Sequence, residues 1–367
     1  MTNRVRLLVL FLTIVVLGAV SVGWVRYAAA RGAQQDRQQQ GGPPVAAGRV
    51  TLAQTGSAGP RLVFRNLVWG PHRDELVSVP AAAPSGPRTA SDVRCLRFYA
   101  AAGTGICLRR LPGTLAEKYQ AVVLDADLRE RRHFSLSGIP TRARVSPSGR
   151  MVAWTVFVSG DSYGGTQFST RTSILDTRTW TLQQSLEDFQ VIMDGKAYRS
   201  ADANFWGVTF ADDGHFYATL GSRGKTYLVH GDIRARTVTT MRENVECPSL
   251  SPDGTRLAFK KRVPGASADA PWREYVLDLR DLQETPLGEQ RSVDDQAVWL
   301  DNHTIAYALA GDYGADLWTV PADGAGSPTR LTVAALAPAV IGSTGEIFVR
   351  PRSGPGSTHD PDPSPLH

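Results

Sequence analysis

Two groups of residues have types and spacings that could support catalysis. Residues 160–165 read Gly-Asp-Ser-Tyr-Gly-Gly, which matches the Gly-x-Ser-x-Gly pattern of a serine nucleophile exposed on a sharp strand-to-helix turn. In the second group, Glu246 and Asp295 could serve as general acid and base if about 5–10 Å separated their carboxyl groups. The elements that carry these residues decide whether either group can work.

The serine motif lacks the elements that it needs. The motif resembles the Gly-x-Ser-Tyr-Gly-Gly sequence of the prolyl oligopeptidase family, whose enzymes contain a β-propeller. A strand is expected at residues 152–158, but residues 166–175 are rich in β-branched residues and show no helical periodicity. His215 and His303 both stand in predicted turns. We therefore interpret the motif as part of a Gly-rich insertion and do not assign Ser162 as a nucleophile.

A strand–turn–strand unit recurs along the chain. In its clearest copy, Ser-Pro-Asp-Gly at residues 251–254, proline presets φ and glycine supplies the positive φ that such a turn requires. The related turns are residues 146–149 (Ser-Pro-Ser-Gly), 211–214 (Ala-Asp-Asp-Gly), 300–303 (Leu-Asp-Asn-His) and 342–345 (Gly-Ser-Thr-Gly). A unit repeated at about 40–50 residues is typical of a β-propeller.

We predict an all-β fold, a β-propeller of six blades over residues 61–350, preceded by one N-terminal apolar helix. Seven blades are an alternative count. A two-sheet β-sandwich or tandem all-β domains are the other folds considered, but sandwiches do not repeat one turn signature at this period.

The Ser-Pro-Asp-Gly and Ser-Pro-Ser-Gly units resemble the repeat of TolB-like proteins, which are periplasmic or exported six-bladed propellers. The motif is specific for the fold and weak for function. The turns ending at Gly214 and Gly345 lack proline, and the turn ending at His303 lacks both proline and glycine. TolB itself also carries an N-terminal α/β domain, for which the residues before 61 leave no room. The resemblance implies a role in envelope translocation or integrity, without implying TolB's own partners.

The N-terminal residues predict a signal or a membrane anchor. No charged residue occurs from Leu7 to Val25, which is longer than the ~7–15 apolar residues of a signal peptide and close to the ~17–25 of a membrane span. Trp24 could lie at the membrane interface. We favour a signal-anchor at residues 1–25 with the following domain outside the cytoplasm. The alternative is a signal peptide and secretion after cleavage near Ala30.

Two further segments lack the signs of a folded domain. Residues 26–60 are rich in Gln, Gly, Ala and Pro, and we predict a flexible linker there. Residues 351–367 contain five prolines and are predicted to be a disordered tail.

Cys95 and Cys107 flank a predicted hairpin. A turn centred on Ala101 would place them directly opposite each other, where they could form a disulfide in an oxidising compartment. A turn nearer Gly103 would shift that register, and two buried free thiols are the alternative. Cys247 is then unpaired and is expected to be a small packed residue.

The charge pattern argues against nucleic-acid binding. Residues 1–50 contain six arginines and one aspartate, which accounts for the whole formal net charge of +5 and leaves residues 51–367 neutral. No basic stripe with interleaved aromatic residues is present. The seven histidines are scattered without metal-ligand spacing, so neither a metal nor a cofactor is expected.

The turns also indicate where a ligand would bind. Propellers present ligands at the channel mouth, where the inner strands begin. Counting eight and seven residues back from each turn's last residue gives the pairs Thr141/Arg142, Trp206/Gly207, Glu246/Cys247, Asp295/Gln296 and Ala337/Pro338. From these pairs and their neighbours, the predicted ligand-binding residues are Arg142, Asn204, Trp206, Glu246, Asp294 and Asp295.

We predict from these residues a non-enzymatic binding propeller outside the cytoplasm that captures a protein segment or a cell-envelope polymer at its channel mouth. An exported hydrolase or lyase that uses the mouth carboxylates is the alternative, and a membrane-spanning sensor is a third. The charges could also serve only one another and trapped water.

Overall fold

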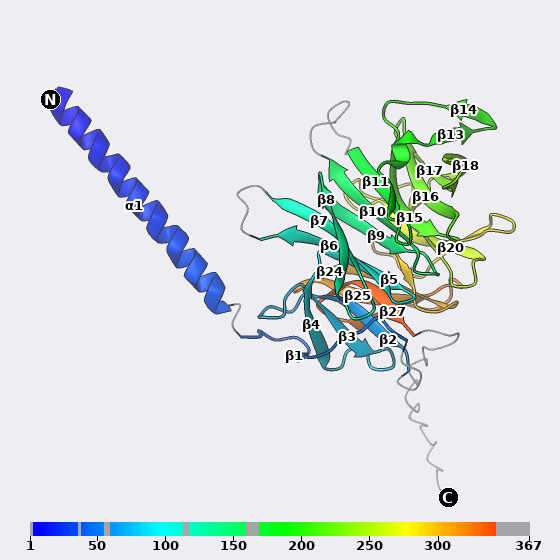
Figure 1. Ribbon diagram of the computed structural model, residues 1–367, viewed down its shortest axis with the longest axis horizontal. Helices are drawn as coiled ribbons and strands as arrows, with labels where there is room; N and C mark the ends of the chain where they lie inside the picture. Colours follow the sequence, from blue (N-terminus) through cyan, green and yellow to red (C-terminus); the bar gives the residue numbers. More distant parts are fainter. Residues whose placement is uncertain (1–2, 36–37, 55–58, 113–116, 159–168, 343–367) are drawn as a thin grey trace, which may run out of the picture.

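The computed structural model is a β-propeller preceded by one helix (Figure 1). It describes residues 3–35, 38–54, 59–112, 117–158 and 169–342. The serine motif at residues 160–165, the last predicted turn beyond Gly342, the predicted end of the propeller up to residue 350 and the predicted tail at residues 351–367 lie outside the described residues. The strands form six separate sheets, so the prediction of a six-bladed propeller is confirmed.

Each blade extends from an inner strand at the channel to an outer strand at the circumference. In that order, blade 1 contains β27 (Ala335–Ile341), β2 (Arg61–Asn66), β3 (Glu75–Pro80) and β4 (Arg88–Arg94), and blade 2 contains β5 (Arg97–Ala101), β6 (Thr104–Leu111), β7 (Lys118–Leu124) and β8 (Glu130–Leu136). Blade 3 contains β9 (Ile139–Val145), β10 (Met151–Val158), β11 (Ser169–Asp176) and β12 (Thr181–Gln183), and blade 4 contains β15 (Asn204–Phe210), β16 (His215–Ser222), β17 (Lys225–Asp232) and β18 (Thr237–Glu243). Blade 5 contains β19 (Glu246–Leu250), β20 (Arg256–Arg262), β21 (Trp272–Asp278) and β22 (Glu284–Pro286), and blade 6 contains β23 (Val298–Trp299), β24 (Thr304–Gly311), β25 (Gly314–Pro321) and β26 (Thr329–Thr332).

Two blades carry extra strands on their outer edges. β1 (Val45–Ala47) pairs parallel with β4 of blade 1. β13 (Gln190–Met193), which follows the short 3-10 helix η1 (Leu186–Asp188), pairs parallel with β18 of blade 4 and antiparallel with β14 (Lys196–Tyr198).

The ring closes in blade 1. β27 pairs antiparallel with β2, so the last described strand lies innermost in the blade that contains the first propeller strands. The hydrophobic core lies between neighbouring blades. Ile106 of blade 2 packs in one cluster with Val152 of blade 3, and Leu228 of blade 4 packs with Leu257 of blade 5. All four side chains are fully buried, and their burial holds adjacent blades together.

The predicted turns explain why the inner hairpins form. Gly254 and Gly149 have φ of 72° and 79°, the region that glycine adopts without steric cost. In blade 6, whose turn has neither proline nor glycine, the Asp301 carboxylate accepts hydrogen bonds from the backbone N–H groups of His303 and Thr304, both at 2.7 Å. An aspartate that caps the turn thus replaces the missing residue types.

Several inner strands carry a bulge near the channel mouth. The pairing register shifts between Trp206 and Thr209 in β15 and between Glu246 and Ser249 in β19. The residues within these shifts, Gly207 and Cys247, have φ of 65° and 52°. Such bulges re-aim side chains, and they fall at the positions that the turn count had marked. A Cβ added at Gly207 would lie 2.7 Å from Cys247 Cα, so the close approach of the two strands requires glycine there.

The N-terminal segment differs from the flexible linker that we expected at residues 26–60. Helix α1 spans Asn3–Gln35, and residues between Gln40 and Leu52 lie against the propeller. β1 adds a strand to blade 1, and Val50 and Leu52 are 3% and 1% exposed in the core. These two buried apolar residues were not recognised from the sequence, because the composition of the surrounding stretch is typical of a linker.

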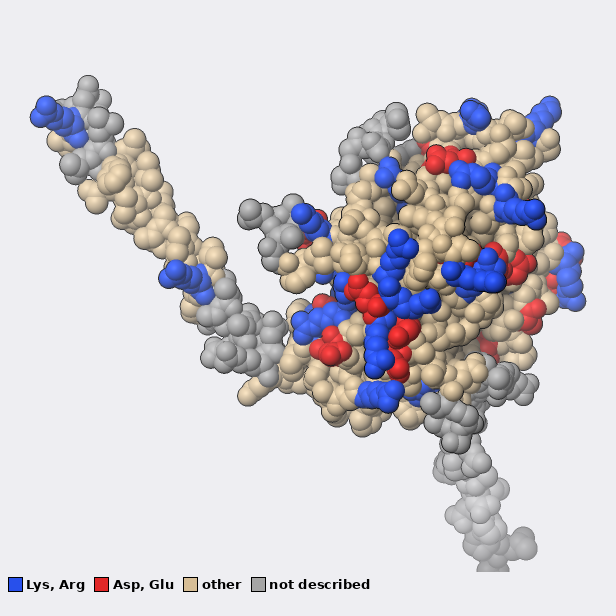
Figure 2. Space-filling model, viewed as in Figure 1, with Lys and Arg blue, Asp and Glu red and all other residues tan. Residues whose placement is uncertain are grey.

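Helix α1 contains one stretch, Leu10–Tyr27, that is long and apolar enough to cross a membrane and is not buried against the propeller. In Figure 2 the middle of α1 shows neither basic nor acidic side chains. The expected N-terminal apolar helix is therefore present, as either a signal or an anchor would require.

The predicted Cys95–Cys107 disulfide is present, although its geometry differs from the one expected. The hairpin turns at Ala102 and Gly103, because Ala101 pairs with Thr104, and Phe98 is the residue opposite Cys107. Cys95 precedes β5 and still reaches Cys107, with a Cα–Cα distance of 5.4 Å. Cys247 is the free cysteine of the described residues and is buried, as expected.

Candidate binding site at the channel mouth

The channel is lined by the innermost strands of the six blades, β27, β5, β9, β15, β19 and β23. A small pocket lies where several of these strands begin. The lining residues that carry its charge are Arg97, Arg142, Arg144 and Asp295, which come from blades 2, 3 and 6. Two predicted site residues, Arg142 and Asp295, are thus brought together. Asn204, Trp206, Glu246 and Asp294 do not line this pocket.

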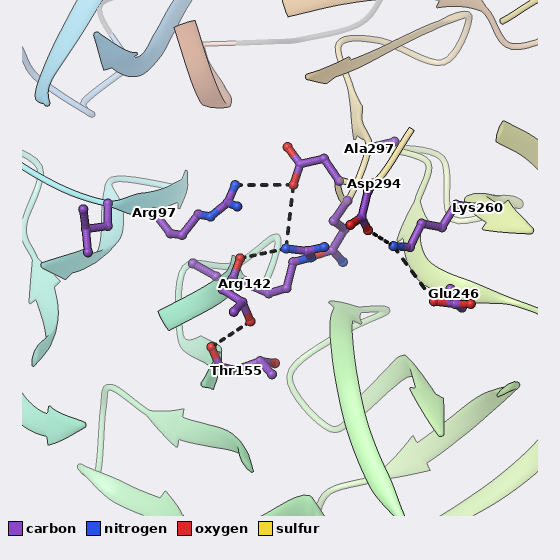
Figure 3. Close-up of polar contacts among 12 residues, drawn as sticks. Arg97, Arg142, Thr155, Glu246, Lys260, Asp294 and Ala297 are labelled. Carbon is purple, nitrogen blue, oxygen red and sulfur yellow. Dashed lines mark hydrogen bonds and ion pairs between the residues drawn. The ribbon is translucent and has the colours of Figure 1, made fainter. Parts of the chain in front are cut away.

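Two arginines share one carboxylate in the pocket. Arg97 Nη1 lies 3.4 Å and Arg142 Nη1 lies 3.9 Å from the same oxygen, Asp295 Oδ1 (Figure 3). Arg142 also donates to the Thr141 carbonyl oxygen at 3.0 Å, but its Nε is buried without a hydrogen-bond partner. A guanidinium has five N–H donors, so this pair keeps donors to spare.

Burial and neighbouring groups shift the pKa values of Arg97 and Arg142 in opposite directions. Burial lowers the pKa of Arg97, against the attraction of Asp295. For Arg142, burial also acts to lower the pKa, but contact with Cys247 and Asp295 outweighs burial, so the net shift is upward. Both groups stay cationic because arginine is not deprotonated in proteins.

Arg144 has a structural role beneath the pocket. Its Nη2 donates to the Ala297 carbonyl oxygen at 2.6 Å, and its guanidinium lies 4.5 Å from the centre of the Tyr99 ring. These contacts tie blade 3 to blades 6 and 2. Arg144 is 7% exposed, and burial lowers its pKa.

Lys260 organises a second group of charges beside the pocket. It lies between Asp294, with which it forms a hydrogen-bonded ion pair, and Glu246, whose Oε2 is 3.9 Å away (Figure 3). Glu246 Oε1 also accepts hydrogen bonds from Arg262 Nε and Trp272 Nε1, both at 3.1 Å. Glu246 is therefore held by two hydrogen-bond donors and one more distant ion-pair partner, which is the arrangement of a structural carboxylate.

Glu274 is a buried acid that the turn count did not find. It stands opposite Lys260 in the β20–β21 pairing and is 1% exposed, and neither of its carboxyl oxygens has a hydrogen-bond partner. Burial raises its pKa to about 8, opposed by Lys260 and assisted by Asp295 and Glu289. Glu274 is therefore largely neutral at pH 7, which leaves cations in excess around the pocket.

Two predicted residues have other roles. Trp206, predicted to bind a ligand, is 9% exposed, and its ring lies against Gly221, where an added Cβ would meet it at 2.7 Å. Asn204 Oδ1 accepts a hydrogen bond from Thr170 N at 2.8 Å, and Asn204 Nδ2 donates to the Asp202 carbonyl oxygen. The Trp206 side chain thus packs within blade 4, and Asn204 ties blade 4 to blade 3.

Arg97, which sequence reasoning missed, begins the inner strand of blade 2. The turn count could not be applied there because the Ala102–Gly103 turn is a tight two-residue hairpin without the repeat signature. A signal did exist, since Arg97 comes two residues after a cysteine already assigned to the start of this strand.

Comparison with solved structures supports the propeller fold. No family model matches the sequence, and no curated protein matches it. Among solved structures, TolB from Acinetobacter baumannii superposes with a TM-score of 0.51 at 15% identity, over 77% of this chain and 66% of that chain. This chain thus spans just under two thirds of that TolB.

Two other matches are more distant. A chain of a nidogen–laminin complex has a TM-score of 0.49 at 10% identity and covers 77% of this chain and 98% of its own. A puromycin-hydrolyzing peptidase of Mycobacterium tuberculosis has a TM-score of 0.47 at 14% identity, over 78% of this chain and 45% of the peptidase. At these identities similarity shows the fold alone: this chain has the six-bladed propeller fold that TolB also has.

Proposed function

We propose that the protein is a non-enzymatic binding module outside the cytoplasm, tethered to a membrane by α1, which captures an extended acidic protein segment at its channel mouth. The observation that carries this proposal is the pair formed by Arg97 and Arg142, which share Asp295 and leave Arg142 Nε buried without a partner. Leaving a buried donor unsatisfied costs about 1–3 kcal/mol. An incoming carboxylate would add an acceptor for the guanidinium, since the Arg142 side chain is 15% exposed.

The chemistry of the pocket favours a carboxylate over a neutral ligand. Arginine matches carboxylates with two parallel hydrogen bonds, and such charge-assisted bonds are stronger than neutral ones. Asp295 holds Arg97 and Arg142 at 3.4 and 3.9 Å, distances longer than an optimal pair. An aspartate or glutamate side chain of a partner segment could approach more closely than Asp295 does.

A binding role fits the state of the mouth carboxylates better than catalysis does. Glu246 is held by Lys260, Arg262 and Trp272, and Asp295 lies between two arginines. Glu274 has the raised pKa of a general acid but is 1% exposed, so a substrate could not contact it. Among these described carboxylates the hydrolase or lyase alternative therefore gains no residue placed to act.

The location rests on two features. The apolar stretch Leu10–Tyr27 supplies a segment able to enter a membrane. The Cys95–Cys107 disulfide indicates an oxidising compartment, since disulfides are rare in the cytosol. Together they favour a propeller held outside the cytoplasm.

The test is fluorescence anisotropy with a short fluorescein-labelled peptide of alternating Asp and Gly, titrated with the full-length protein in detergent. We expect Arg97→Ala/Arg142→Ala to weaken binding by about 100-fold, since truncating a buried, hydrogen-bonded charge costs about 2–5 kcal/mol. The matched control is Arg178→Ala/Arg280→Ala, which removes two exposed arginines and should leave the affinity unchanged.

Two results would contradict the proposal. One is equal affinity for the Asn analogue of the peptide, which has no charge. The other is stronger competition by polygalacturonate than by unlabelled peptide, which would assign the mouth to an anionic polymer. Reaction of the protein with a fluorophosphonate or turnover of an acyl ester would restore the enzymatic alternative.

A further inference from the structure

The outer edge of blade 2 differs from the outer edges of the other blades. β4 and β18, each of seven residues, are covered by the extra strands β1 and β13. The outer strands β12, β22 and β26 have only three, three and four residues. β8 has seven residues, and among the described residues no strand pairs with its outer side.

An open edge of this length is unusual because it leaves a row of backbone N–H and C=O groups free to pair with another chain. Proteins commonly protect such edges by shortening or covering them, and the described parts of the other five blades show one device or the other. β5, β6, β7 and β8 follow one another from the channel outward (Figure 1), so the open edge lies on the circumference of the propeller, away from the mouth.

The side chains of β8 give this edge a positive charge. Arg131 and Arg132 are exposed, and their guanidinium groups lie 5.1 and 5.4 Å from the centre of the Trp180 ring. Among the described residues neither arginine forms an ion pair, whereas Glu130 is already paired with Arg109 and His133. Cations held against an aromatic ring and lacking a carboxylate would complement an acidic partner.

The pairing of β8 with β7 limits where a partner could add. The register shifts between Val123 and Leu124, opposite Arg131. Such a bulge interrupts the ladder and leaves Arg132 to Leu136 as its regular part. The two described strands that cover the outer strand of a blade, β1 and β13, both pair parallel to the strand they cover.

We infer that the outer edge of β8 is a strand-addition site for an extended acidic segment of a partner protein, which pairs in parallel with residues 132–136. Backbone hydrogen bonds supply the pairing, and Arg131 and Arg132 select acidic side chains on the added strand. The site is separate from the channel mouth and does not use Arg97 or Arg142.

The experiment uses full-length protein in detergent and a fluorescein-labelled peptide of alternating Glu and Val. Anisotropy gives the affinity, and hydrogen exchange with mass spectrometry gives the location. We expect binding with slowed exchange of the backbone amides at residues 132–136. Arg131→Glu/Arg132→Glu should weaken binding at least about tenfold, because like charges would then face each other. Both residues are exposed, so the variant should fold, which circular dichroism checks.

An analogue of the peptide with N-methylated backbone amides is the matched probe, since it keeps the charges but cannot pair as a strand. It should cause no slowed exchange at residues 132–136, whereas the parent peptide should still slow exchange there in Arg97→Ala/Arg142→Ala. The inference is overturned if the methylated peptide also slows exchange at residues 132–136, if the parent peptide slows exchange elsewhere and not there, or if the parent peptide does not bind.

Discussion

The channel mouth and the β8 edge both gather arginines, but they do so in opposite surroundings. At the mouth the side chains of Arg142 and Asp295 are 15% and 13% exposed, whereas Arg131 and Arg132 at the edge are exposed to solvent. Charges out of water interact strongly and are costly to leave unpaired, while exposed pairs contribute little and are screened by salt. We therefore expect ligand binding at the mouth to depend mainly on charge pairing. Binding at the edge should depend mainly on backbone hydrogen bonds.

The largest expected effect comes from removing the carboxylate that the mouth arginines share. Asp295→Asn leaves Arg97 and Arg142 without an anionic partner, and we expect a loss of about 3–5 kcal/mol in the free energy of unfolding. Urea denaturation followed by circular dichroism measures this loss.

The matched change at the edge is Glu130→Gln, which removes the exposed partner of Arg109 and His133. It should cost less than about 1 kcal/mol. Equal losses in the two variants would break the contrast between the mouth and the edge.

The next largest effect concerns the start of β5, which carries Arg97. Cys95→Ser/Cys107→Ser removes a disulfide between residues 12 apart, and a loop of that length predicts a loss of about 3 kcal/mol. Thermal unfolding of the variant, and of the parent with and without reductant, gives the measurement. Cys247→Ser is the control that keeps the disulfide, and a parent protein indifferent to reductant would refute the assignment.

Glu274 should make the stability of the mouth depend on pH. Its pKa is raised from 4.5 to about 8 in the folded protein, so the native state holds a proton that the unfolded state releases above about pH 4.5. Its contribution to stability is therefore complete at low pH and is lost as the pH rises toward 8. Between about pH 5.5 and 7.5 the loss is about 2–3 kcal/mol.

Glu274→Gln cannot release a proton, so the free-energy difference between this variant and the parent should change across that pH range in favour of the variant. Urea titrations at several pH values test this. Glu117→Gln is the control because its carboxylate is exposed and paired with Arg110, and it should give a difference that is nearly constant over the same range. A constant difference for Glu274→Gln would show that Glu274 is ionised in the native state.

The smallest expected effect is the change in peptide affinity at the two sites as the salt concentration rises. Binding of the Glu–Val peptide to the β8 edge should weaken about tenfold between about 0.05 and 0.5 M NaCl, because exposed charges are screened over a few ångströms at high salt. Binding of the Asp–Gly peptide at the mouth should weaken by less than about threefold, since buried charges are screened less. Anisotropy titrations in series give both slopes, and the reverse order would contradict the contrast in burial.

Much of the fold could be predicted from the recurring turns. Each turn depends on the types of a few neighbouring residues, which can be read directly from the sequence. The turns also located Arg142 and Asp295, since both precede a recognisable turn by a fixed distance. The count failed in blade 2, where a two-residue hairpin replaces the usual turn and shifts Arg97 out of the pattern. Trp206 was placed at the right end of β15, but packing against Gly221 buries its ring, and no local signal reveals that contact.

Other parts of the site depend on pairing between strands. Lys260 and Glu274 come together because β20 and β21 align them, and both strands lie outside the innermost strand of blade 5, to which the turn count applies. The parallel pairing of β1 with β4 joins segments about 40 residues apart, and the composition around β1 gave no sign of it. Such contacts depend on how paired strands align with one another, and turn motifs do not specify that alignment.

The most direct test of the binding claim is to locate an acidic ligand on the protein. A diazirine-bearing version of the Asp–Gly peptide, photolysed with the full-length protein and mapped by mass spectrometry, reports where it binds. We predict crosslinks to the pocket lining at Asp295 and Ala337, which are not fully buried, and their loss in Arg97→Ala/Arg142→Ala. Crosslinks confined to other surfaces, or unchanged in that variant, would contradict the assignment of the channel mouth as the binding site.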